Sequence, residues 1–221
     1  MVIYLDGADL QQMGRFKVDG YTTNPSLMRK SGVTDYRSFA RGVLECANGK
    51  PVSFEVLASG MDGMAADAME IASWGENVFV KIPVLTPSGA FTGPILARLS
   101  LAGVKLNVTA VMTADQVHMA LSSLQTTGHI ISIFAGRIAD SGVDPETAVS
   151  EAVRMSSGRA QILWASVREA FNVIQAERCR ADIITLTPEM LEKCSLFGRD
   201  LTKCAIETVQ QFTRDAEGIT L

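Results

Sequence analysis

The sequence predicts a (β/α)8 barrel, and three observations lead to that fold class. Short apolar runs alternate with longer segments of helical periodicity along the whole chain. The 221 residues spread over eight such units, roughly 28 residues each, which lies near the lower end of the size range of these barrels. An open doubly wound sheet would normally show a glycine-rich first turn. The first strand is instead followed by DGADL.

The predicted strands are short and rich in β-branched residues, as expected for strands buried on both faces. They cover residues 2–5, 20–22, 52–56, 78–82, 105–108, 130–134, 161–165 and 183–185. The second, GYT, is weak on its own and is predicted from its place in the alternation. Helices are predicted over residues 25–46, 61–74, 93–102, 113–124, 144–155, 167–179, 188–195 and 200–212. Asn24 and Pro25 supply a cap and a first turn for the first of these helices.

Composition indicates a compact protein without a strongly charged surface. The chain is 47% hydrophobic, only 20% charged and carries a net charge of −4 without a Lys/Arg cluster. We therefore expect neither nucleic acid nor membrane as a partner. No linker or low-complexity stretch divides the sequence, so residues 1–221 are expected to form a single domain.

Targeting signals and metal motifs are not apparent. The N-terminus has no basic region followed by an apolar stretch, and no apolar run approaches the ~20 residues of a membrane span. The four cysteines lie far apart without a C-x-x-C pair. We therefore expect reduced thiols in a cytoplasmic protein, and neither a metal nor a cofactor.

Polar residues gather at the C-terminal ends of the predicted strands, where the active sites of parallel barrels lie. Apart from Lys105, the strand interiors are nearly free of charge. One polar residue at a strand end means little, but agreement across nearly all strands indicates a shared site. These residues are Asp6, Thr22, Asn24, Glu55, Lys81, Asn107, Thr109, Ser132, Arg137, Ser166, Arg168 and Thr185.

Lys81 is the most informative of these residues. It stands in VFVKIPV, between apolar residues and close to a proline. A buried ammonium is costly, so an amine in such surroundings is more easily neutral, the form that attacks a carbonyl to make a Schiff base. The alternative is a structural lysine that reaches solvent or forms an ion pair with Glu55.

Two carboxylates and two arginines complete the predicted site. Cleavage of a carbon–carbon bond beside an iminium requires a base, and imine formation requires a second proton carrier. Asp6 and Glu55 suit these tasks, with a helix-cap role for Asp6 as the alternative. Arg137 and Arg168 indicate a phosphate, which barrels often bind near the last strands. The alternative for each arginine is a surface or salt-bridging role.

Several stretches together resemble the transaldolase family, most closely its small subfamily that includes fructose-6-phosphate aldolase. The stretches are YLDGAD, GYTTNPSL, SFEVLA, VFVKIPV, GVKLNVTAVMTADQ, SIFAGRIADSG, ILWASVREAFNVIQA and ADIITLTPEML. The resemblance implies that Lys81 forms the Schiff base, that Asp6 acts in carbon–carbon cleavage, and that Glu55 and Thr109 hold a catalytic water. It further implies that the dihydroxyacetone part contacts Asn24, Asn107 and Ser132, with Thr22 nearby, and that the phosphate contacts Arg137, Ser166 and Arg168.

Glu55 and Phe134 separate the two activities within the resembled family. Transaldolases carry Glu and Phe at these sites, whereas the aldolases carry Gln and a Tyr that helps protonate the intermediate. The resemblance therefore implies transfer of dihydroxyacetone between sugar phosphates in the pentose phosphate pathway. Cleavage with release of dihydroxyacetone and a non-catalytic sugar-phosphate-binding barrel are the alternatives.

Two further expectations come from the resemblance. Small family members form ring-based homo-oligomers, so a pentamer or decamer is expected, with the C-terminal helix and arm at about 200–221 contacting a neighbouring subunit. Ile133 and Trp164 depart from the family pattern. Trp164 should point away from the mouth of the barrel if Ser166 and Arg168 are correctly placed.

Overall fold

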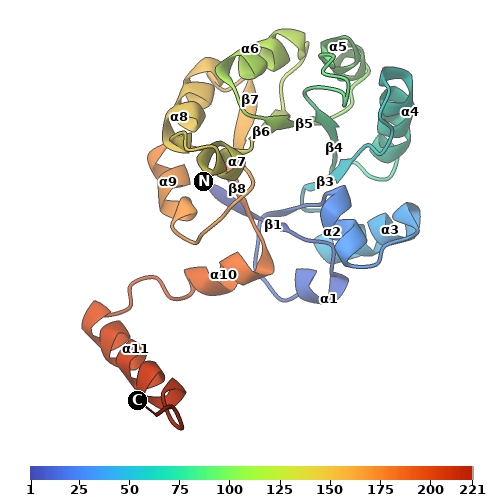
Figure 1. Cartoon of the computed structure of the whole chain (residues 1–221). Helices are drawn as coiled ribbons and strands as arrows, with labels where there is room; N and C mark the ends of the chain where they lie inside the picture. Colours follow the sequence, from blue (N-terminus) through green and yellow to red (C-terminus); the bar gives the residue numbers. More distant parts are fainter. Residues whose placement is uncertain (221) are drawn as a thin grey trace.

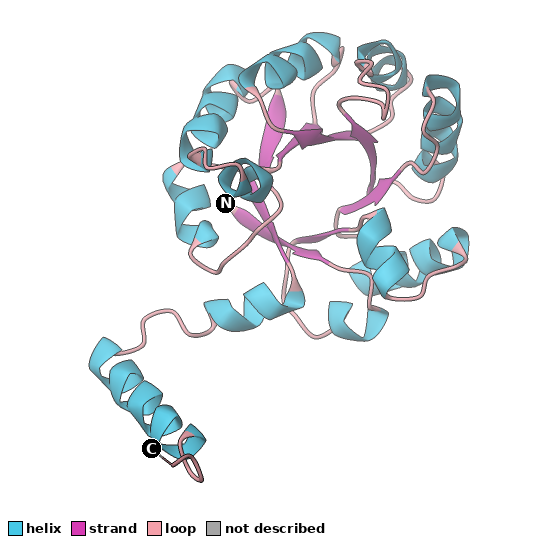
Figure 2. Ribbon diagram, viewed as in Figure 1, coloured by secondary structure: helices cyan, strands magenta, loops and turns pink. Residues whose placement is uncertain are grey.

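The computed structural model describes residues 1–220, and its centre is a closed barrel of eight parallel strands. Neighbours in sequence pair with each other, and the last strand pairs with the first, so the predicted fold class is confirmed (Figures 1 and 2). The strands are β1 (Val2–Asp6), β2 (Gly20–Thr22), β3 (Val52–Glu55), β4 (Val78–Pro83), β5 (Leu106–Val111), β6 (His129–Ile133), β7 (Ala160–Trp164) and β8 (Ile183–Leu186).

Helices surround the barrel on its outside (Figure 2). They are α1 (Leu10–Met13), α2 (Pro25–Lys30), α3 (Tyr36–Ala47), α4 (Met61–Ala72), α5 (Gly93–Leu101), α6 (Ala114–Ser123), α7 (Ala135–Asp140), α8 (Pro145–Ser156), α9 (Asn172–Arg178) and α10 (Pro188–Cys194), with α11 (Leu201–Asp215) after them. Within residues 1–220, none of the helices has the length and apolar character needed to span a lipid bilayer.

The prediction of one helix over residues 25–46 is wrong, because two helices cover this region. Gly32 adopts a positive φ of 72°, a conformation that ends α2. Asp35 then begins α3 by accepting a hydrogen bond from the backbone N–H of Ser38. A local cap therefore overrides the continuous apolar periodicity.

The helix predicted over residues 167–179 begins later, at Asn172. Ser166 has a φ of 63°, in the left-handed region, and the residues between it and Asn172 form a loop that carries Arg168. Two helices, α1 and α7, escaped prediction because four and six residues are too few to show helical periodicity.

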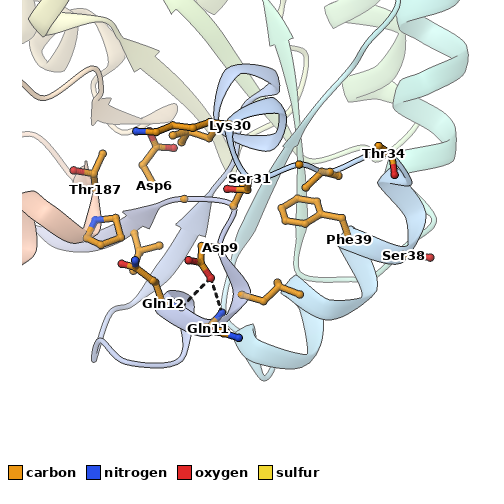
Figure 3. Close-up of a pocket in the computed structure, with 18 of the residues that line it drawn as sticks. Asp6, Asp9, Gln11, Gln12, Lys30, Ser31, Thr34, Ser38, Phe39 and Thr187 are labelled. Carbon is orange, nitrogen blue, oxygen red and sulfur yellow. Dashed lines mark hydrogen bonds between the residues drawn. The ribbon is translucent and has the colours of Figure 1, made fainter.

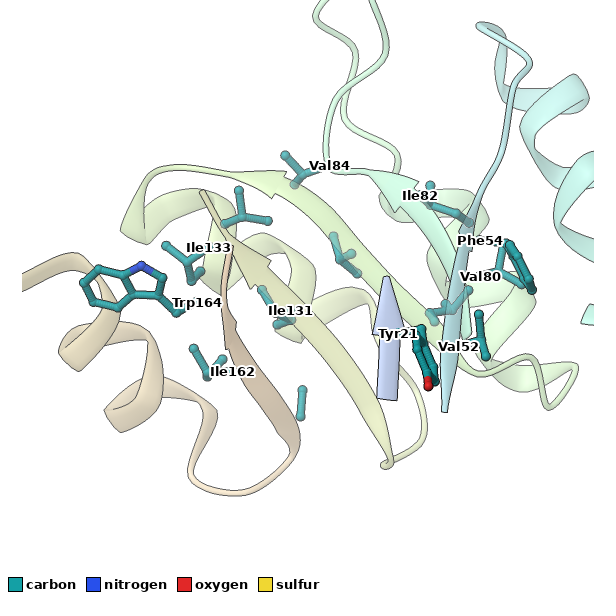
Figure 4. Packing of buried hydrophobic residues seen from close by; sticks show 14 of the residues in the cluster. Tyr21, Val52, Phe54, Val80, Ile82, Val84, Ile131, Ile133, Ile162 and Trp164 are labelled. Carbon is teal, nitrogen blue, oxygen red and sulfur yellow. The ribbon is translucent and has the colours of Figure 1, made fainter. Parts of the chain in front are cut away.

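Side chains alternate between the two faces of the strands, so the core has two parts. The larger part lies between the barrel and the helices, and it contains Trp164 together with Ile133 and Ile162 (Figure 4). Trp164 therefore points away from the barrel interior, as expected. Its neighbour Leu163 points inward.

A small apolar cluster fills the inside of the barrel below the mouth. It comprises Tyr4, Ile130, Leu163, Ala165 and Ile183, with Phe79 and Phe134 against it. Gly20 is required here, because a Cβ atom at this position would lie 2.6 Å from the Tyr4 ring. These side chains form an apolar floor beneath the polar residues at the strand ends.

The C-terminal helix α11 stands apart from the barrel (Figure 1), and none of its residues in the described chain is buried. An apolar stripe along it is exposed, with Leu201, Val209 and Phe212 at 83%, 61% and 65% of their full accessibility. Within residues 1–220, the apolar face of this amphipathic helix is not packed against the barrel.

Candidate active site

The predicted site residues converge on one cavity at the mouth of the barrel. Twelve residues, Phe134 included and Thr185 not, received a role from the family resemblance, and eleven of them line a space of about 490 Å³. They are Asp6, Thr22, Asn24, Glu55, Lys81, Thr109, Ser132, Phe134, Arg137, Ser166 and Arg168. The cavity is also lined by Thr185 and Thr187 from the end of β8 and by the apolar side chains of Leu163 and Ala165.

Lys81 lies on β4 with its amine at the floor of this cavity. The residue is only 5% exposed. Its Nζ donates to the carbonyl oxygen of Thr23 at 2.7 Å and lies 2.9 Å from Oε2 of Glu55. Glu55 stands opposite Lys81 in the β3–β4 register, so strand pairing itself brings the two charges together. The lysine is thus both buried and ion-paired, and its side chain does not reach bulk solvent.

Asp6 presents a second carboxylate to the same cavity from the end of β1. Burial raises its pKa above the ordinary value, and the nearby Lys81 charge together with a hydrogen bond from Thr22 partly opposes that rise. A raised pKa makes this carboxylate a stronger base than an aspartate in water. The helix-cap alternative is wrong, because Asp9 caps α1.

Hydroxyl groups link Asp6 to the neighbouring strands. Thr22 donates to Oδ1 of Asp6 at 2.8 Å, and its hydroxyl lies 2.6 Å from that of Thr185. Thr22 has one hydroxyl proton, so Thr185 must be the donor in the second bond while Asp6 is ionised. The chain Thr185–Thr22–Asp6 thus holds the carboxylate in one orientation.

Asn107 is the one predicted residue that does not line the cavity. It is fully buried beneath the mouth, opposite Lys81 in the β4–β5 register. Its Nδ2 donates to the hydroxyl of Ser53 at 3.1 Å, and its Oδ1 accepts from Ser132 at 2.7 Å. In this structure Asn107 therefore orients Ser132, which itself faces the cavity.

Asn24 combines a structural and a surface role. Its Oδ1 accepts from the backbone N–H of Leu27 at 3.0 Å and so begins α2, as the sequence predicted. Because the oxygen is used in the cap, the amide N–H2 group is the part left for the cavity, which Asn24 also lines.

Thr109 brings an unpaired hydroxyl to the cavity. The side chain is 1% exposed, and its Oγ1 has no hydrogen-bond partner within residues 1–220. The next residue, Ala110, has a φ of 58°, and the β5–β6 register shifts between Val108 and Val111. This bulge sets the direction of the Thr109 side chain. A buried hydroxyl without a partner is suited to bind a water or a substrate oxygen.

The two arginines differ in their surroundings. Arg137, on α7, lies with its guanidinium carbon 6.0 Å from the centroid of the Phe134 ring. No carboxylate of the described residues lies within 4 Å of it. Arg168 binds Asp140 through two nitrogens, Nε at 3.0 Å and Nη2 at 2.6 Å from Oδ2. The salt-bridging alternative therefore applies to Arg168, and that arginine lowers the pKa of Asp140.

Close backbone packing joins the helix that carries Arg137 to the loop that carries Arg168. A Cβ atom at Gly136 would lie 1.6 Å from the carbonyl oxygen of Ser166, so no other residue fits here without moving the loop. Ser166, on the other side of this contact, has a left-handed backbone conformation. Gly136 thus positions the loop after β7 against the first turn of α7.

Sequence reasoning missed Asp140 and undervalued Thr185. Asp140 lies 28 residues from Arg168, and no local pattern indicates such a long-range pair. Thr185 ends the eighth predicted strand, but its role depends on the barrel closing β8 onto β1.

A second cavity, of about 1120 Å³, adjoins the first and shares Asp6, Leu27 and Thr187 with it. Figure 3 shows this cavity, with Asp9 bound to the backbone N–H groups of Gln11 and Gln12. It is the larger of the two, but Lys81 and Glu55 do not line it. We therefore place the chemistry in the smaller cavity. Within residues 1–220, no group of three or more His, Cys, Asp or Glu side chains could hold a metal ion.

Fold and site together define an aldolase-type barrel, with a buried lysine and two carboxylates at its mouth. The sequence matches the Transaldolase/Fructose-6-phosphate aldolase family over residues 3–220, and the chain belongs to this family.

Similar proteins come from archaea and bacteria. A probable transaldolase of Methanococcus maripaludis is 36% identical over 214 residues, covering 94% of each chain. One of Nitrosopumilus maritimus is 32% identical over 227 residues, covering 99% of this chain and 96% of its own. Among solved structures, the putative copper homeostasis protein CutC from Streptococcus agalactiae aligns with a TM-score of 0.63 at 12% identity, over 85% of this chain and 99% of its own. That last likeness concerns the fold alone.

The Lys81–Glu55 pair predicts a characteristic stability pattern. Lys81→Met leaves the largely buried Glu55 carboxylate without its cation, and we expect a loss of about 2 to 3 kcal/mol in the free energy of unfolding. Adding Glu55→Gln removes the stranded charge and should recover about 1 kcal/mol or more. Urea denaturation measures both. A double variant as unstable as Lys81→Met would show that the ion pair does not govern the stability of this site.

Proposed function

We propose that this protein is a metal-free class I transaldolase that moves a dihydroxyacetone unit between sugar phosphates through a Schiff base on Lys81. The observation that supports this most is the placement of the Lys81 amine, buried at the floor of the cavity and 2.9 Å from Glu55, with Asp6 lining the same space. The donor is a ketose phosphate such as sedoheptulose 7-phosphate or fructose 6-phosphate. The acceptor is an aldose phosphate such as glyceraldehyde 3-phosphate or erythrose 4-phosphate.

Schiff-base formation starts with loss of a proton from the Lys81 ammonium, for which Glu55 is the adjacent acceptor. The neutral amine attacks the ketone carbon, and the carbinolamine then loses water to become an iminium. Glu55 and the unpaired hydroxyl of Thr109 both line the cavity. Together they hold the water that carries protons during these steps.

Carbon–carbon cleavage follows from the iminium. Asp6 takes the proton of the hydroxyl on the departing carbon, the bond next to that carbon breaks, and its electron pair enters the enamine on Lys81. An aldose phosphate leaves, and another aldehyde then accepts the same electron pair in the reverse reaction. The raised pKa of Asp6 suits both directions, because the group must take the proton and later return it.

Substrate binding uses the remaining polar residues of the cavity. Thr22, Asn24 and Ser132 contact the hydroxyl groups of the dihydroxyacetone part, and Asn107 acts from beneath by orienting Ser132. Arg137 and Arg168 bind the phosphate with Ser166. Since Arg168 also pairs with Asp140, the phosphate shares this guanidinium with a carboxylate that keeps it in place.

Phe134 favours transfer over simple cleavage. Its ring lines the cavity above the inner apolar cluster, and it carries no proton to give to the enamine. The enamine therefore persists until an aldehyde arrives. A fructose-6-phosphate aldolase would protonate it and release dihydroxyacetone, and this remains the second candidate within the family.

Reductive trapping tests the covalent step. With borohydride and fructose 6-phosphate, we expect one dihydroxyacetone-sized adduct on the peptide that contains Lys81, detected by mass spectrometry. Lys105→Met is a matched control and should leave trapping unchanged, because Lys105 lies just before β5 and does not line the cavity. An unmodified Lys81 in the wild-type protein would refute the enzyme and favour a non-catalytic sugar-phosphate-binding barrel.

Phe134→Tyr tests the proposed preference for transfer. Placing a phenol beside the enamine should raise the release of free dihydroxyacetone without acceptor by about tenfold, since a general acid now stands at the reacting carbon. The wild type should consume fructose 6-phosphate only when an aldose phosphate is added. Rapid release of dihydroxyacetone by the wild type alone would identify the aldolase instead.

We also propose that the protein forms a homo-oligomer, a pentamer or decamer, in which α11 contacts a neighbouring copy. The exposed stripe of Leu201, Val209 and Phe212 supports this, because an amphipathic helix needs a partner for its apolar face.

A pair of adjacent substitutions tests this assembly. Val209→Asp puts a charge on the apolar stripe and should reduce the mass measured by light scattering. Gln210→Asp adds the same charge about 100° further round α11, outside the line of Leu201, Val209 and Phe212, and should leave the mass unchanged. Equal masses for wild type and Val209→Asp would rule out this use of α11.

A further inference from the structure

Asn172, at the start of α9, does not line the cavity, but its side chain makes three hydrogen bonds. The residue is 7% exposed. Its Oδ1 accepts from the backbone N–H of Arg168 at 2.9 Å and from that of Glu169 at 3.2 Å. One side-chain oxygen thus closes the loop that carries the proposed phosphate-binding arginine. No other side-chain bond of the described residues holds these two amides.

A relay of amides leads from Asn172 to α8. Its Nδ2 donates to Oε1 of Gln175 at 2.7 Å, and Nε2 of Gln175 donates to Oε1 of Glu146 at 3.0 Å. Glu146 stands in the first turn of α8. The relay therefore joins the loop after β7 to the helix that precedes β7.

The direction of this relay is set at its far end. An ionised carboxylate can only accept, so Gln175 must turn its N–H2 group toward Glu146 and its oxygen toward Asn172. Asn172 must then turn its N–H2 group toward Gln175, which leaves its oxygen facing the loop. Glu146 thereby fixes which end of Asn172 meets the backbone N–H groups of Arg168 and Glu169.

We propose that Asn172 is a positioning residue for phosphate recognition, with its orientation imposed by Glu146 through Gln175. The inference rests on the proposed role of Arg168. Arg168 is held at its side chain by Asp140, and its loop is held at one end by the contact between Gly136 and Ser166. Asn172 holds the other end, so the guanidinium faces the cavity without a rearrangement when phosphate binds.

Reversal of the relay gives a sharp test. Asn172→Asp keeps an oxygen for the loop but places a second oxygen against that of Gln175. Gln175 can turn over only by placing its own oxygen against the Glu146 carboxylate. Adding Glu146→Gln removes that conflict, because the new amide donates to the turned Gln175. Glu146→Gln alone can keep the original direction. The double variant has the net charge of the wild type, with the negative charge moved toward the phosphate site.

The readout is the sugar concentration that gives half-maximal borohydride trapping at Lys81. For fructose 6-phosphate we expect about a tenfold rise in Asn172→Asp, a return to within about twofold of wild type in the double variant, and no change in Glu146→Gln alone. For dihydroxyacetone, which has no phosphate, all variants should match the wild type. Gln175→Met cuts the relay but leaves the bonds from Asn172 to the backbone N–H groups of Arg168 and Glu169. It should raise the half-maximal concentration of fructose 6-phosphate about threefold.

The outcomes separate this inference from the proposed function. Absence of trapping in the wild type with either sugar refutes the Schiff base. Normal wild-type trapping with no effect of Asn172→Asp or Gln175→Met refutes the positioning role. An Asn172→Asp defect for fructose 6-phosphate that Glu146→Gln fails to repair refutes the relay and indicates repulsion between the new carboxylate and the phosphate. A defect that extends equally to dihydroxyacetone also refutes the positioning role and indicates a general loss of structure.

Discussion

A buried ammonium held beside a carboxylate is the interaction on which the rest of the site depends. Lys81 lies over an apolar floor of barrel side chains, so its charge requires partners within the barrel mouth. Glu55 supplies a charge at 2.9 Å, and the Thr23 carbonyl supplies an acceptor at 2.7 Å. Glu55 belongs to the neighbouring strand β3, and Thr23 directly follows β2, so the pairing of β2, β3 and β4 assembles this part of the site. A pair of this kind contributes little net stability but places an amine and its proton acceptor in contact.

The opposite wall of the cavity is organised around a different constraint. There the first turn of α7 and the loop after β7 approach so closely that only glycine fits at position 136. This contact, the Asp140 carboxylate and the Asn172 amide all act on the segment that carries Arg168. Arg137, in contrast, approaches the cavity from the start of a short helix. One cation is therefore held rigidly and the other is available, an arrangement suited to a phosphate that must bind and leave in every turnover.

The fold was predictable from sequence because it depends on local alternation. Each strand is a short apolar run with polar residues at its C-terminal end. In a closed parallel barrel these ends all lie at the same face. Eleven of the twelve proposed residues line one cavity for this reason. Asn107 lies beneath it, two residues before Thr109 on β5, and its amide is bonded to Ser53 and Ser132. Such bonds between strands cannot be read from a single apolar run.

Local sequence patterns could not predict the contacts between segments that lie far apart in the chain. The pair of Arg168 with Asp140 and the relay from Glu146 join parts of the chain that no periodicity connects. The break between α2 and α3 was missed because a turn at Gly32 interrupts an otherwise continuous helical pattern. Amide direction in the relay likewise emerges only when the partners are seen together.

A crystal structure of the borohydride-reduced complex with fructose 6-phosphate tests the central claim most directly. The account predicts continuous density from Nζ of Lys81 to the former ketone carbon of a three-carbon unit. If an adduct retains all six carbons, Asp6 should lie beside the hydroxyl of the departing carbon, and the phosphate should lie against Arg137 and Arg168. Density that joins the sugar to another residue, or a sugar bound in the neighbouring cavity with Lys81 still paired to Glu55, would contradict it.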